Sequence, residues 1–279
     1  MKTLYMTDLD GTLLQPDQTI SPRTRTILNR LAEEGCLFSV CTARSLIGLQ
    51  MLPFHDVRFT APMVLMNGVM LYDYESRQIL DQTAMAPGVV AHVLEICARH
   101  GKNPFLYRVE DNQVISHYTT LTSVGETLFL DSRIGRFPDL FCREAAYDTD
   151  REAVYFSMQD SRECLGAIQE ELERDEPTVA STLYKDNYME DNWYLEVFDR
   201  RAGKDNGVRR AQRMTGAGRL VVFGDNDNDL PMLRIADTAC VVGNGVATAR
   251  AEADVIIGRN DEDGVALYML EQWERREEG

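Results

Sequence analysis

The chain has 279 residues, of which 44% are hydrophobic and 27% charged, a composition typical of a globular protein that excludes a largely disordered chain. The length exceeds the usual size of one domain, so we expect one large α/β unit or two domains, and favour two. The net charge of −16 would repel nucleic acid and an anionic membrane, so we expect neither as a partner and expect local cations to hold any phosphate ligand.

The N-terminal segment reaches Lys2 and Asp8 before the apolar core of a signal peptide could form, and no apolar run approaches the roughly 18 residues of a membrane span. We therefore expect a cytoplasmic protein. Residues 4–6 are predicted to form a buried strand, directly followed by Asp8-Leu9-Asp10-Gly11-Thr12. Ligands collect at the carboxyl ends of strands in open α/β sheets, so this string is a candidate site. Two carboxylates ~4 Å apart repel by ~4 kcal/mol at an effective dielectric of about 20, so a cation or a shared proton must compensate.

The next segment predicts a β-α-β unit. Ser21 and Pro22 are typical of a helix start, Gly35 of its end, and residues 36–41 of a short buried strand that stops at Thr42-Ala43-Arg44. Such a unit favours a parallel sheet. The Thr42 hydroxyl and nearby N–H groups are suited to hold phosphate oxygens, and a plain helix-capping role is the alternative.

After this unit the sequence predicts a strand at 64–66, a hairpin-like turn at Asn67-Gly68 and a strand at 69–72. A second block begins after these elements. From about residue 82 the pattern becomes that of an α+β domain, with no clear prediction between residues 118 and 150. The expected elements are helices at 87–101 and 161–174 and strands at 105–109, 114–117, 154–158, 178–184 and 193–198.

The β-α alternation resumes after Gly203, with a helix from Lys204, a strand at 220–223, a helix near 230, strands at 240–242 and 255–257, and a last helix from 263. We therefore predict an α/β fold with a Rossmann-like parallel-sheet core. The core consists of residues 1–81 and 199–279, and residues 82–198 form an inserted α+β cap domain.

A second acidic cluster, Gly224-Asp225-Asn226-Asp227-Asn228-Asp229, directly follows the predicted strand 220–223 and can meet the first cluster in space. An EF-hand loop is excluded because its sixth and twelfth positions are Leu230 and Ala236. Two oxygen-rich strand ends favour Mg²⁺ beside a phosphate, and a solvated acidic turn is the alternative. Lys204 opposes the dipole of its helix, which an anionic partner would explain; a solvent-exposed lysine is the alternative.

Other metal and cofactor sites are disfavoured. The six cysteines contain no C-x-x-C pair, and the four histidines show no metal-ligand spacing, so we expect reduced thiols acting as small core residues and structural histidines. Gly243-Asn244-Gly245 lacks the third glycine of a dinucleotide loop, since Thr248 stands in its place.

In chain order, Asp8-x-Asp10, Thr42, Lys204 and Gly224-Asp225-x-x-Asn228-Asp229 resemble the motifs of the haloacid dehalogenase-like (HAD) phosphohydrolases. The resemblance covers almost the whole chain and is closest to the Cof-type branch, subfamily IIB, whose α/β cap is inserted between the threonine and lysine motifs. Further cues typical of this branch are Asn67-Gly68, Leu195-Glu196-Val197, Gly243-Asn244, Ala251-Glu252-Ala253-Asp254 and Asp263-Gly264-Val265-Ala266.

The resemblance implies a role for each matching position. Asp8 would be the nucleophile that becomes an aspartyl phosphate, and Asp10 the general acid and base. Mg²⁺ would be bound by the Asp8 carboxylate, the Asp10 backbone carbonyl and Asp225, with Asp229 supporting this shell from behind. The phosphoryl group would be held by the backbones of Leu9 and Ala43 and by the side chains of Thr42, Lys204 and Asn228.

Two positions depart from the branch, because Ala43 and Asp205 stand where its members usually have glycine. Ala43 keeps its N–H, so we expect little loss. Asp205 places a carboxylate beside Lys204, where it either caps the helix or weakens phosphate affinity.

The resemblance implies a Mg²⁺-dependent phosphatase of a small phosphorylated metabolite, with sugar phosphates favoured, acting as a monomer or small homo-oligomer. The alternatives are a phosphomutase of the phosphomannomutase type and a non-catalytic phospho-ligand-binding protein. A halide-removing enzyme is disfavoured because its nucleophile would not need Asp10 or an acidic metal cluster. The candidates for contact with the leaving group are cap residues Arg108, Tyr184, Lys185, Tyr188 and Trp193.

Overall fold

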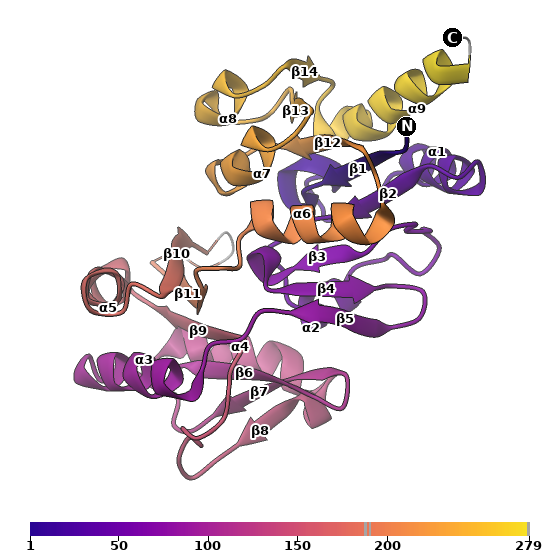
Figure 1. The fold of residues 1–279 in the computed structure, drawn as a ribbon. Coiled ribbons are helices and arrows are strands. Elements are labelled where there is room, and N and C mark those ends of the chain that lie inside the picture. Colours follow the sequence, from indigo (N-terminus) through magenta and orange to yellow (C-terminus); the bar gives the residue numbers. More distant parts are fainter. Residues whose placement is uncertain (187–188, 190, 278–279) are drawn as a thin grey trace. The chain divides into compact units, whose positions relative to one another are not determined.

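The computed structural model describes residues 1–186, 189 and 191–277 (Figure 1). The chain divides into two compact units: a first unit of residues 1–81 and 203–279, and a second unit of residues 82–202. The chain returns from the second unit to the first after Ala202. Strand β11 (Trp193–Asp199) ends at Asp199, and a turn follows it before this boundary. Among the described residues, no helix is long and apolar enough to cross a membrane.

The first unit contains the predicted parallel sheet, with strands in the order β14-β13-β12-β1-β2. All neighbouring strands are parallel, and β1 (Thr3–Thr7) lies between β12 (Arg219–Gly224) and β2 (Leu37–Val40). The carboxyl ends of these three strands therefore meet at one edge, where ligands of such sheets bind. The outer strands are β13 (Thr238–Val242) and β14 (Val255–Ile257).

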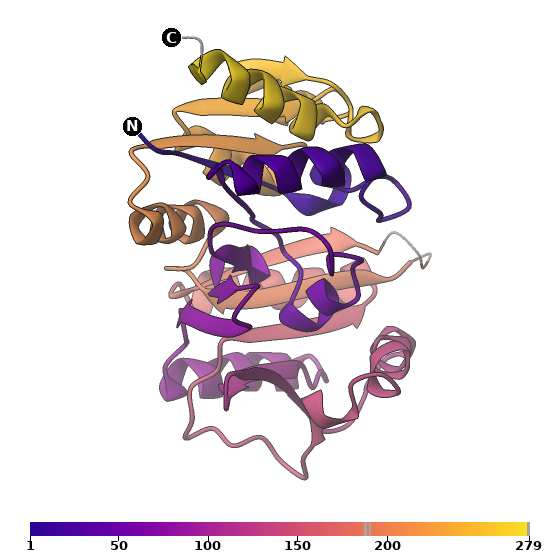
Figure 2. The same ribbon diagram turned by 90° about the vertical axis from the view of Figure 1, so that its right-hand side faces the viewer.

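Helices cover both faces of this sheet because the side chains of its strands alternate between them. Met6 of β1 packs in a core with Val208 of α6 on one face. Tyr5 of β1 stacks on Phe223, whose ring contacts Tyr268 of α9 on the other. Figures 1 and 2 show α1 beside α9, with α6 across the sheet. The helices are α1 (Pro22–Glu33), α2 (Leu46–Gln50), α6 (Lys204–Thr215), α7 (Leu230–Arg234), α8 (Ala247–Ala251) and α9 (Gly264–Glu277).

A small second sheet of β3 (Met63–Leu65), β4 (Met70–Asp73) and β5 (Gln78–Gln82) also lies largely in the first unit. The predicted turn at Asn67-Gly68 joins β3 to its antiparallel partner β4. The sequence did not predict β5, because each of its side chains is at least partly exposed and polar residues dominate its ends.

The second unit is built on a mixed sheet in the order β10-β11-β9-β6-β7-β8 (Figure 1). Its neighbouring strands are antiparallel, except that β7 (Gln113–Tyr118) runs parallel to β8 (Phe141–Arg143). Helices α3 (Pro87–Arg99) and α5 (Arg162–Asp175) share a core with one face. On the other face, Phe129 of α4 (Val124–Ile134) contacts Phe105 and Tyr194. The remaining strands are β6 (Phe105–Glu110), β9 (Tyr155–Asp160) and β10 (Val179–Lys185).

The elements without a sequence prediction in this unit are α4 and β8. Val124 and Leu128 of α4 are 68% and 51% exposed, so the apolar residues of this helix do not form the single stripe that identifies a helix. Strand β8 is only three residues long. The predicted α/β fold with a parallel core sheet and a separate inserted sheet is confirmed.

Candidate active site

Asp8 directly follows β1, and its side chain is buried. Its backbone N–H donates to the carbonyl oxygen of Phe223 on β12 at 2.9 Å, so strand pairing continues to Asp8 and fixes it at the sheet edge. The chain then turns through Gly11 at φ +84°, a conformation that glycine adopts without steric cost. A Cβ atom on Gly11 would lie 2.6 Å from Oδ2 of Asp225, so glycine also leaves room for that carboxylate.

Lys204 joins the two acidic clusters. Its Nζ donates to Oδ1 of Asp8 at 2.5 Å and to Oδ1 of Asp229 at 2.7 Å, and all three side chains are buried. The lysine begins α6, and a Cβ on Gly68 would lie 1.9 Å from the carbonyl oxygen of Gly203 just before it. The close approach of these two glycine backbones therefore fixes the position of the lysine. Lys204 is thus not the solvent-exposed lysine of the alternative interpretation.

Asp225 and Asp229 occupy different positions in the second cluster. Oδ2 of Asp229 accepts hydrogen bonds from the backbone N–H groups of Asp225 and Asn226, at 2.9 and 3.1 Å. Its Oδ1 accepts from Lys204, so both oxygens of Asp229 are engaged. Oδ1 of Asp225 accepts a hydrogen bond from the Thr12 hydroxyl at 2.7 Å. Carboxylate oxygens of Asp8, Asp225 and Asp229 lie within 4.8 Å of one another. The two acidic clusters therefore meet, as the sequence predicted.

The electrostatics of this cluster follow from burial. Burial raises the pKa of Asp8 well above its usual value, which the charge of Lys204 only partly opposes. Burial also raises the pKa of Asp225 to about 6. The hydrogen bond from Thr12 opposes this rise, and the negative charge of Asp229 adds to it. For Lys204, burial alone would lower the pKa, but the attraction of Asp229 and Asp8 outweighs it and raises the pKa. The lysine is therefore charged, and its ammonium group contacts the carboxyl groups of Asp8 and Asp229, beside which the Asp225 carboxyl group lies.

Three ionised carboxylates beside a single ammonium group would carry an excess of negative charge, which suits a divalent cation. Every donor in the cluster is a hard oxygen, which is the ligand type that Mg²⁺ prefers. Because both oxygens of Asp229 are already engaged, Asp8 and Asp225 are the side chains best placed to offer oxygens. The residues present thus fit the predicted cation.

The carboxylate of Asp10 lies outside this hydrogen-bonded network. Its side chain is 50% exposed and pairs with Arg44, with Oδ2 at 2.7 Å from Nε and Oδ1 at 2.6 Å from Nη2. The same Nη2 donates to Gln18 at 3.0 Å. Arg44 was not assigned a role from the sequence, because nothing in Thr42-Ala43-Arg44 shows that the loop after β2 reaches the loop after β1.

Apart from Lys204, the predicted phosphate-binding residues lie in the segments that follow β1, β2 and β12. Thr42 is buried after β2, where its N–H donates to Val64 at 2.9 Å and its hydroxyl oxygen accepts the Arg44 N–H at 3.1 Å. The hydroxyl hydrogen of Thr42 can therefore donate elsewhere. Leu9 is buried after β1, Ala43 is half-buried beside Thr42, and Asn228 is exposed in the turn after β12.

Asn244 is a further residue whose role the sequence did not reveal. Its amide Nδ2 donates to the carbonyl oxygen of Gly11 at 2.7 Å, while its Oδ1 accepts the N–H of Asn260 at 3.0 Å. It therefore holds the turn that carries the first acidic motif. Asp205 is half-buried in the first turn of α6, where a carboxylate is favoured by the helix dipole, and the ammonium of Lys204 binds Asp8 and Asp229 instead.

Arg108, one of the five predicted contacts to the leaving group, is used structurally. Its guanidinium is buried and donates to the carbonyl oxygen of Glu152 at 3.1 Å and to that of Asp148. Burial lowers the pKa of Arg108, and the nearby Arg151 adds to this effect. The side chain thus anchors the segment before β9.

The other four candidates differ in how far their side chains are engaged. Tyr184 donates from its hydroxyl to Glu196 at 2.8 Å, Lys185 is exposed, and Trp193 is half-buried. Tyr188 lies outside the described residues.

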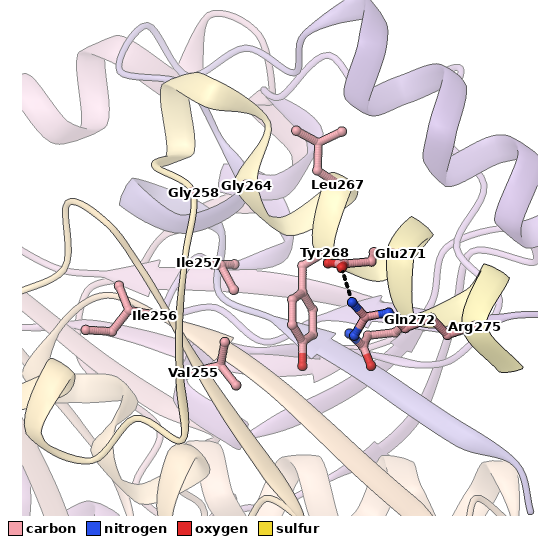
Figure 3. Close-up of a pocket in the computed structure, with 10 residues that line it drawn as sticks. All are labelled: Val255, Ile256, Ile257, Gly258, Gly264, Leu267, Tyr268, Glu271, Gln272 and Arg275. Carbon is pink, nitrogen blue, oxygen red and sulfur yellow. Dashed lines mark hydrogen bonds and ion pairs between the residues drawn. The ribbon is translucent and has the colours of Figure 1, made fainter.

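A hollow of about 550 Å³ lies between β14 and α9 (Figure 3). Ile256, Ile257 and Tyr268 form much of its lining, and Glu271 pairs with Arg275 at 2.6 Å on α9. None of the predicted site residues lines it, so it is separate from the carboxylate cluster.

A parallel α/β sheet with buried carboxylates and a lysine at its carboxyl edge is an arrangement typical of an enzyme core. The family model of the haloacid dehalogenase-like hydrolases matches residues 5–269. The chain belongs to this family, as the sequence predicted.

Three known proteins illustrate the similarity. Pyridoxal phosphate phosphatase YbhA of Escherichia coli K12 is 26% identical over 94% of this chain and 95% of its own length. The 5-amino-6-(5-phospho-D-ribitylamino)uracil phosphatase YitU of Bacillus subtilis 168 is 27% identical over 96% of each chain. The structure of the HAD subclass IIB sugar phosphatase BT4131 superposes with a TM-score of 0.71 and 19% identity, over 96% of this chain and 98% of that one. The chain is accordingly a hydrolase of the phosphatase type.

Proposed function

We propose that this chain is a Mg²⁺-dependent phosphatase that hydrolyses a small phosphorylated metabolite, preferentially a sugar phosphate, through an aspartyl-phosphate intermediate. The observation that carries the proposal is the buried contact of Asp8 with Lys204 beside Asp225, at the carboxyl edge of the parallel sheet. The substrates named for the two curated relatives are both small phosphate monoesters, which supports the substrate class. In this proposal the first unit is the catalytic core and the second unit supplies specificity.

Asp8 and Asp10 divide the reaction into two displacements. A carboxylate oxygen of Asp8 attacks phosphorus while the ester oxygen leaves and takes a proton from Asp10, which yields the alcohol and an aspartyl phosphate. Water then attacks the same phosphorus, gives its proton to Asp10 and restores the Asp8 carboxylate as inorganic phosphate leaves. The Asp10 side chain is half exposed and pairs with Arg44, so release of this pair would free it for both proton transfers.

The phosphoryl group requires donors that match its negative charge. We assign this role to the ammonium of Lys204, the Thr42 hydroxyl, the N–H groups of Leu9 and Ala43, and the amide of Asn228. The lysine is preorganised, because its two carboxylate partners hold it at the site before substrate arrives. Preorganised donors stabilise developing charge without reorganising during the reaction.

We assign Mg²⁺ binding to the Asp8 carboxylate, the Asp10 backbone carbonyl and the Asp225 carboxylate, with Asp229 orienting this group from behind through its bonds to Lys204 and to the backbone of Asp225. When bound, the cation neutralises charge that would otherwise repel a phosphate dianion. Thr12 and Gly11 position Asp225 for this role.

The proposal is tested by measuring phosphate release from p-nitrophenyl phosphate with Mg²⁺ and after chelation. We expect hydrolysis that requires Mg²⁺ and disappears in Asp8→Asn, while the exposed control Asp17→Asn keeps it. Circular dichroism checks that each variant is folded. Undiminished turnover in Asp8→Asn would contradict the nucleophile assignment. A panel of phosphorylated metabolites then defines the substrate, and assays for sugar-phosphate isomerisation distinguish hydrolysis from mutase activity.

A further inference from the structure

A second group of side chains of the metal-ligating type lies in the second unit, where the spacing of histidines and cysteines in the sequence does not indicate one. Strands β7 and β8 pair in parallel with His117 opposite Cys142, so these two side chains project from the same face of the sheet. The N–H of Glu144 donates to Tyr118 at 2.8 Å, which continues the pairing and places Glu144 two residues beyond Cys142, on that face. A ring nitrogen of His117, the Sγ of Cys142 and a carboxylate oxygen of Glu144 lie within 4.8 Å of one another.

The geometry points to a site for a borderline divalent transition ion of the Zn²⁺ type, with His117, Cys142 and Glu144 as its ligands. Imidazole nitrogen, thiolate sulfur and carboxylate oxygen are the ligands that Zn²⁺ takes in proteins, at about 2.0–2.3 Å. The thiolate favours such an ion over Mg²⁺ or Ca²⁺. Two bonds of this length at a tetrahedral angle place donor atoms roughly 3.3–3.7 Å apart, so modest side-chain rotations bring the three atoms to one ion.

The surroundings of the His117 ring provide independent support. Its Nδ1 lies 2.5 Å from Oε1 of Glu144, and its Nε2 is buried without a hydrogen-bond partner among the described residues. That Nε2 lies 3.6 Å from a carboxylate oxygen of Glu110. Ligation through Nδ1 would place the ring proton on Nε2, where it faces Glu110. A metal-bound histidine typically donates its second N–H to a carboxylate in this way.

The accessibility of the group also fits metal entry. Cys142 is exposed, in contrast to the expectation that the cysteines are small core residues, which holds for Cys36, Cys41, Cys97 and Cys240. The His117 side chain is 5% exposed, so the ligand group combines a fixed, buried base with a thiol open to solvent. Three protein ligands leave a fourth position for water. A bound ion would connect the ends of β7 and β8 and so fasten this short edge strand.

The inference is tested on the full chain, stripped of metal and kept in excess Mg²⁺ so that the all-oxygen cluster of the first unit is supplied with its own cation. Co²⁺ is added as the probe, because a thiolate ligand gives it a charge-transfer absorption that oxygen ligands do not. We expect this band to saturate at one equivalent. It should be lost in Cys142→Ser and retained in the control Cys164→Ser, which removes the half-exposed thiol of α5.

The other two ligands are tested by affinity. Outer-shell partners of metal sites contribute roughly 10–100-fold to affinity, so loss of the ligand itself in Glu144→Gln or His117→Gln should weaken Co²⁺ binding by more than that. Zn²⁺ should displace Co²⁺ and raise the unfolding temperature of the wild-type chain more than that of Cys142→Ser. Absence of a saturable thiolate band in the wild-type chain, or an unchanged band in Cys142→Ser, would overturn the inference. Phosphate release is a separate readout, because none of these ligands belongs to the proposed active site.

Discussion

The Nζ atom of Lys204 lies 2.5 Å from Oδ1 of Asp8, although 196 positions separate the two residues in the sequence. One residue follows the strand β1 and the other begins the helix α6, and both belong to the first unit. The contact is buried, so each charge depends on the other for compensation of its lost hydration. The charge of Lys204 therefore offsets part of the cost of burying the Asp8 carboxylate.

Lys204→Met should destabilise the first unit strongly. The variant leaves Asp8 and Asp229 buried without their cation, and breaking a buried ion pair on one side typically costs about 3–5 kcal/mol. The free energy of unfolding from urea titration at about pH 8, where the carboxylates tend to ionise, measures the loss. Arg213→Met is the matched control, because it removes an exposed cation from the last turn of the same helix. Equal losses in both variants would contradict the importance of the buried contact.

Asp10→Asn should slow turnover without unfolding the protein. A general acid and base contributes about 10²–10⁴-fold, so kcat for p-nitrophenyl phosphate should fall within that range. Stability should change by less than about 1 kcal/mol, because the Asp10 side chain is half exposed and its ion pair with Arg44 is solvated. Asp17→Asn removes another exposed carboxylate nearby and should leave kcat unchanged. A full rate in Asp10→Asn would exclude the proton-transfer role.

Mg²⁺ binding should weaken as the pH falls through about 6. In the metal-free chain the pKa of Asp225 is raised to about 6, so the folded state takes up a proton there that competes with the cation. Below that pH, protonation of Asp225 alone should lower the affinity by up to about tenfold per pH unit. Because the pKa of Asp225 is raised, the folded state holds more protons than the unfolded state, and metal-free stability should fall as the pH rises from about 4 to 6.

Titration calorimetry with Mg²⁺ from about pH 5 to about pH 8 measures this dependence. Asp10→Asn is the control, since our assignment gives Asp10 a backbone ligand only and the variant keeps that carbonyl. Asp225→Asn should bind weakly at every pH. A wild-type affinity that stays constant between about pH 5 and 7 would refute the assignment of Asp225 as a ligand.

The features that the sequence predicted are those encoded by local chemistry. Apolar runs that end in acidic or hydroxyl residues identified β1, β2 and β12, and the rule that ligands gather at the carboxyl ends of parallel strands then brought Asp8 and Asp225 together. Neither the apolar runs nor the rule about strand ends predicts that Lys204 is buried. Its burial depends on the contact between the backbones at Gly68 and Gly203, which only the tertiary structure reveals.

The features that escaped prediction depend on contacts between distant segments. The pairing of Asp10 with Arg44 requires two loops to meet above adjacent strands. The grouping of His117 with Cys142 requires the parallel register of β7 with β8, and no pattern in the sequence predicts β8. Spacing along the chain carries no information about such a register, so a search for metal-ligand spacing could not have found this group.

Gly11→Ala and Gly35→Ala form a matched pair that separates backbone strain from crowding at the site. The two glycines have φ values of +84° and +85°, so either substitution should cost about 1–2 kcal/mol for placing an L-residue in the left-handed region. A Cβ on Gly35 meets nothing within 4 Å, whereas a Cβ on Gly11 lies 2.6 Å from the Asp225 carboxylate. We therefore expect Gly35→Ala to keep its phosphate release and Mg²⁺ affinity, and Gly11→Ala to lose both because Asp225 must move. Comparison of kcat and of the Mg²⁺ dissociation constant in the two variants measures the difference. If both retained wild-type Mg²⁺ affinity, the position of Asp225 beside Gly11 would not matter for the cation site.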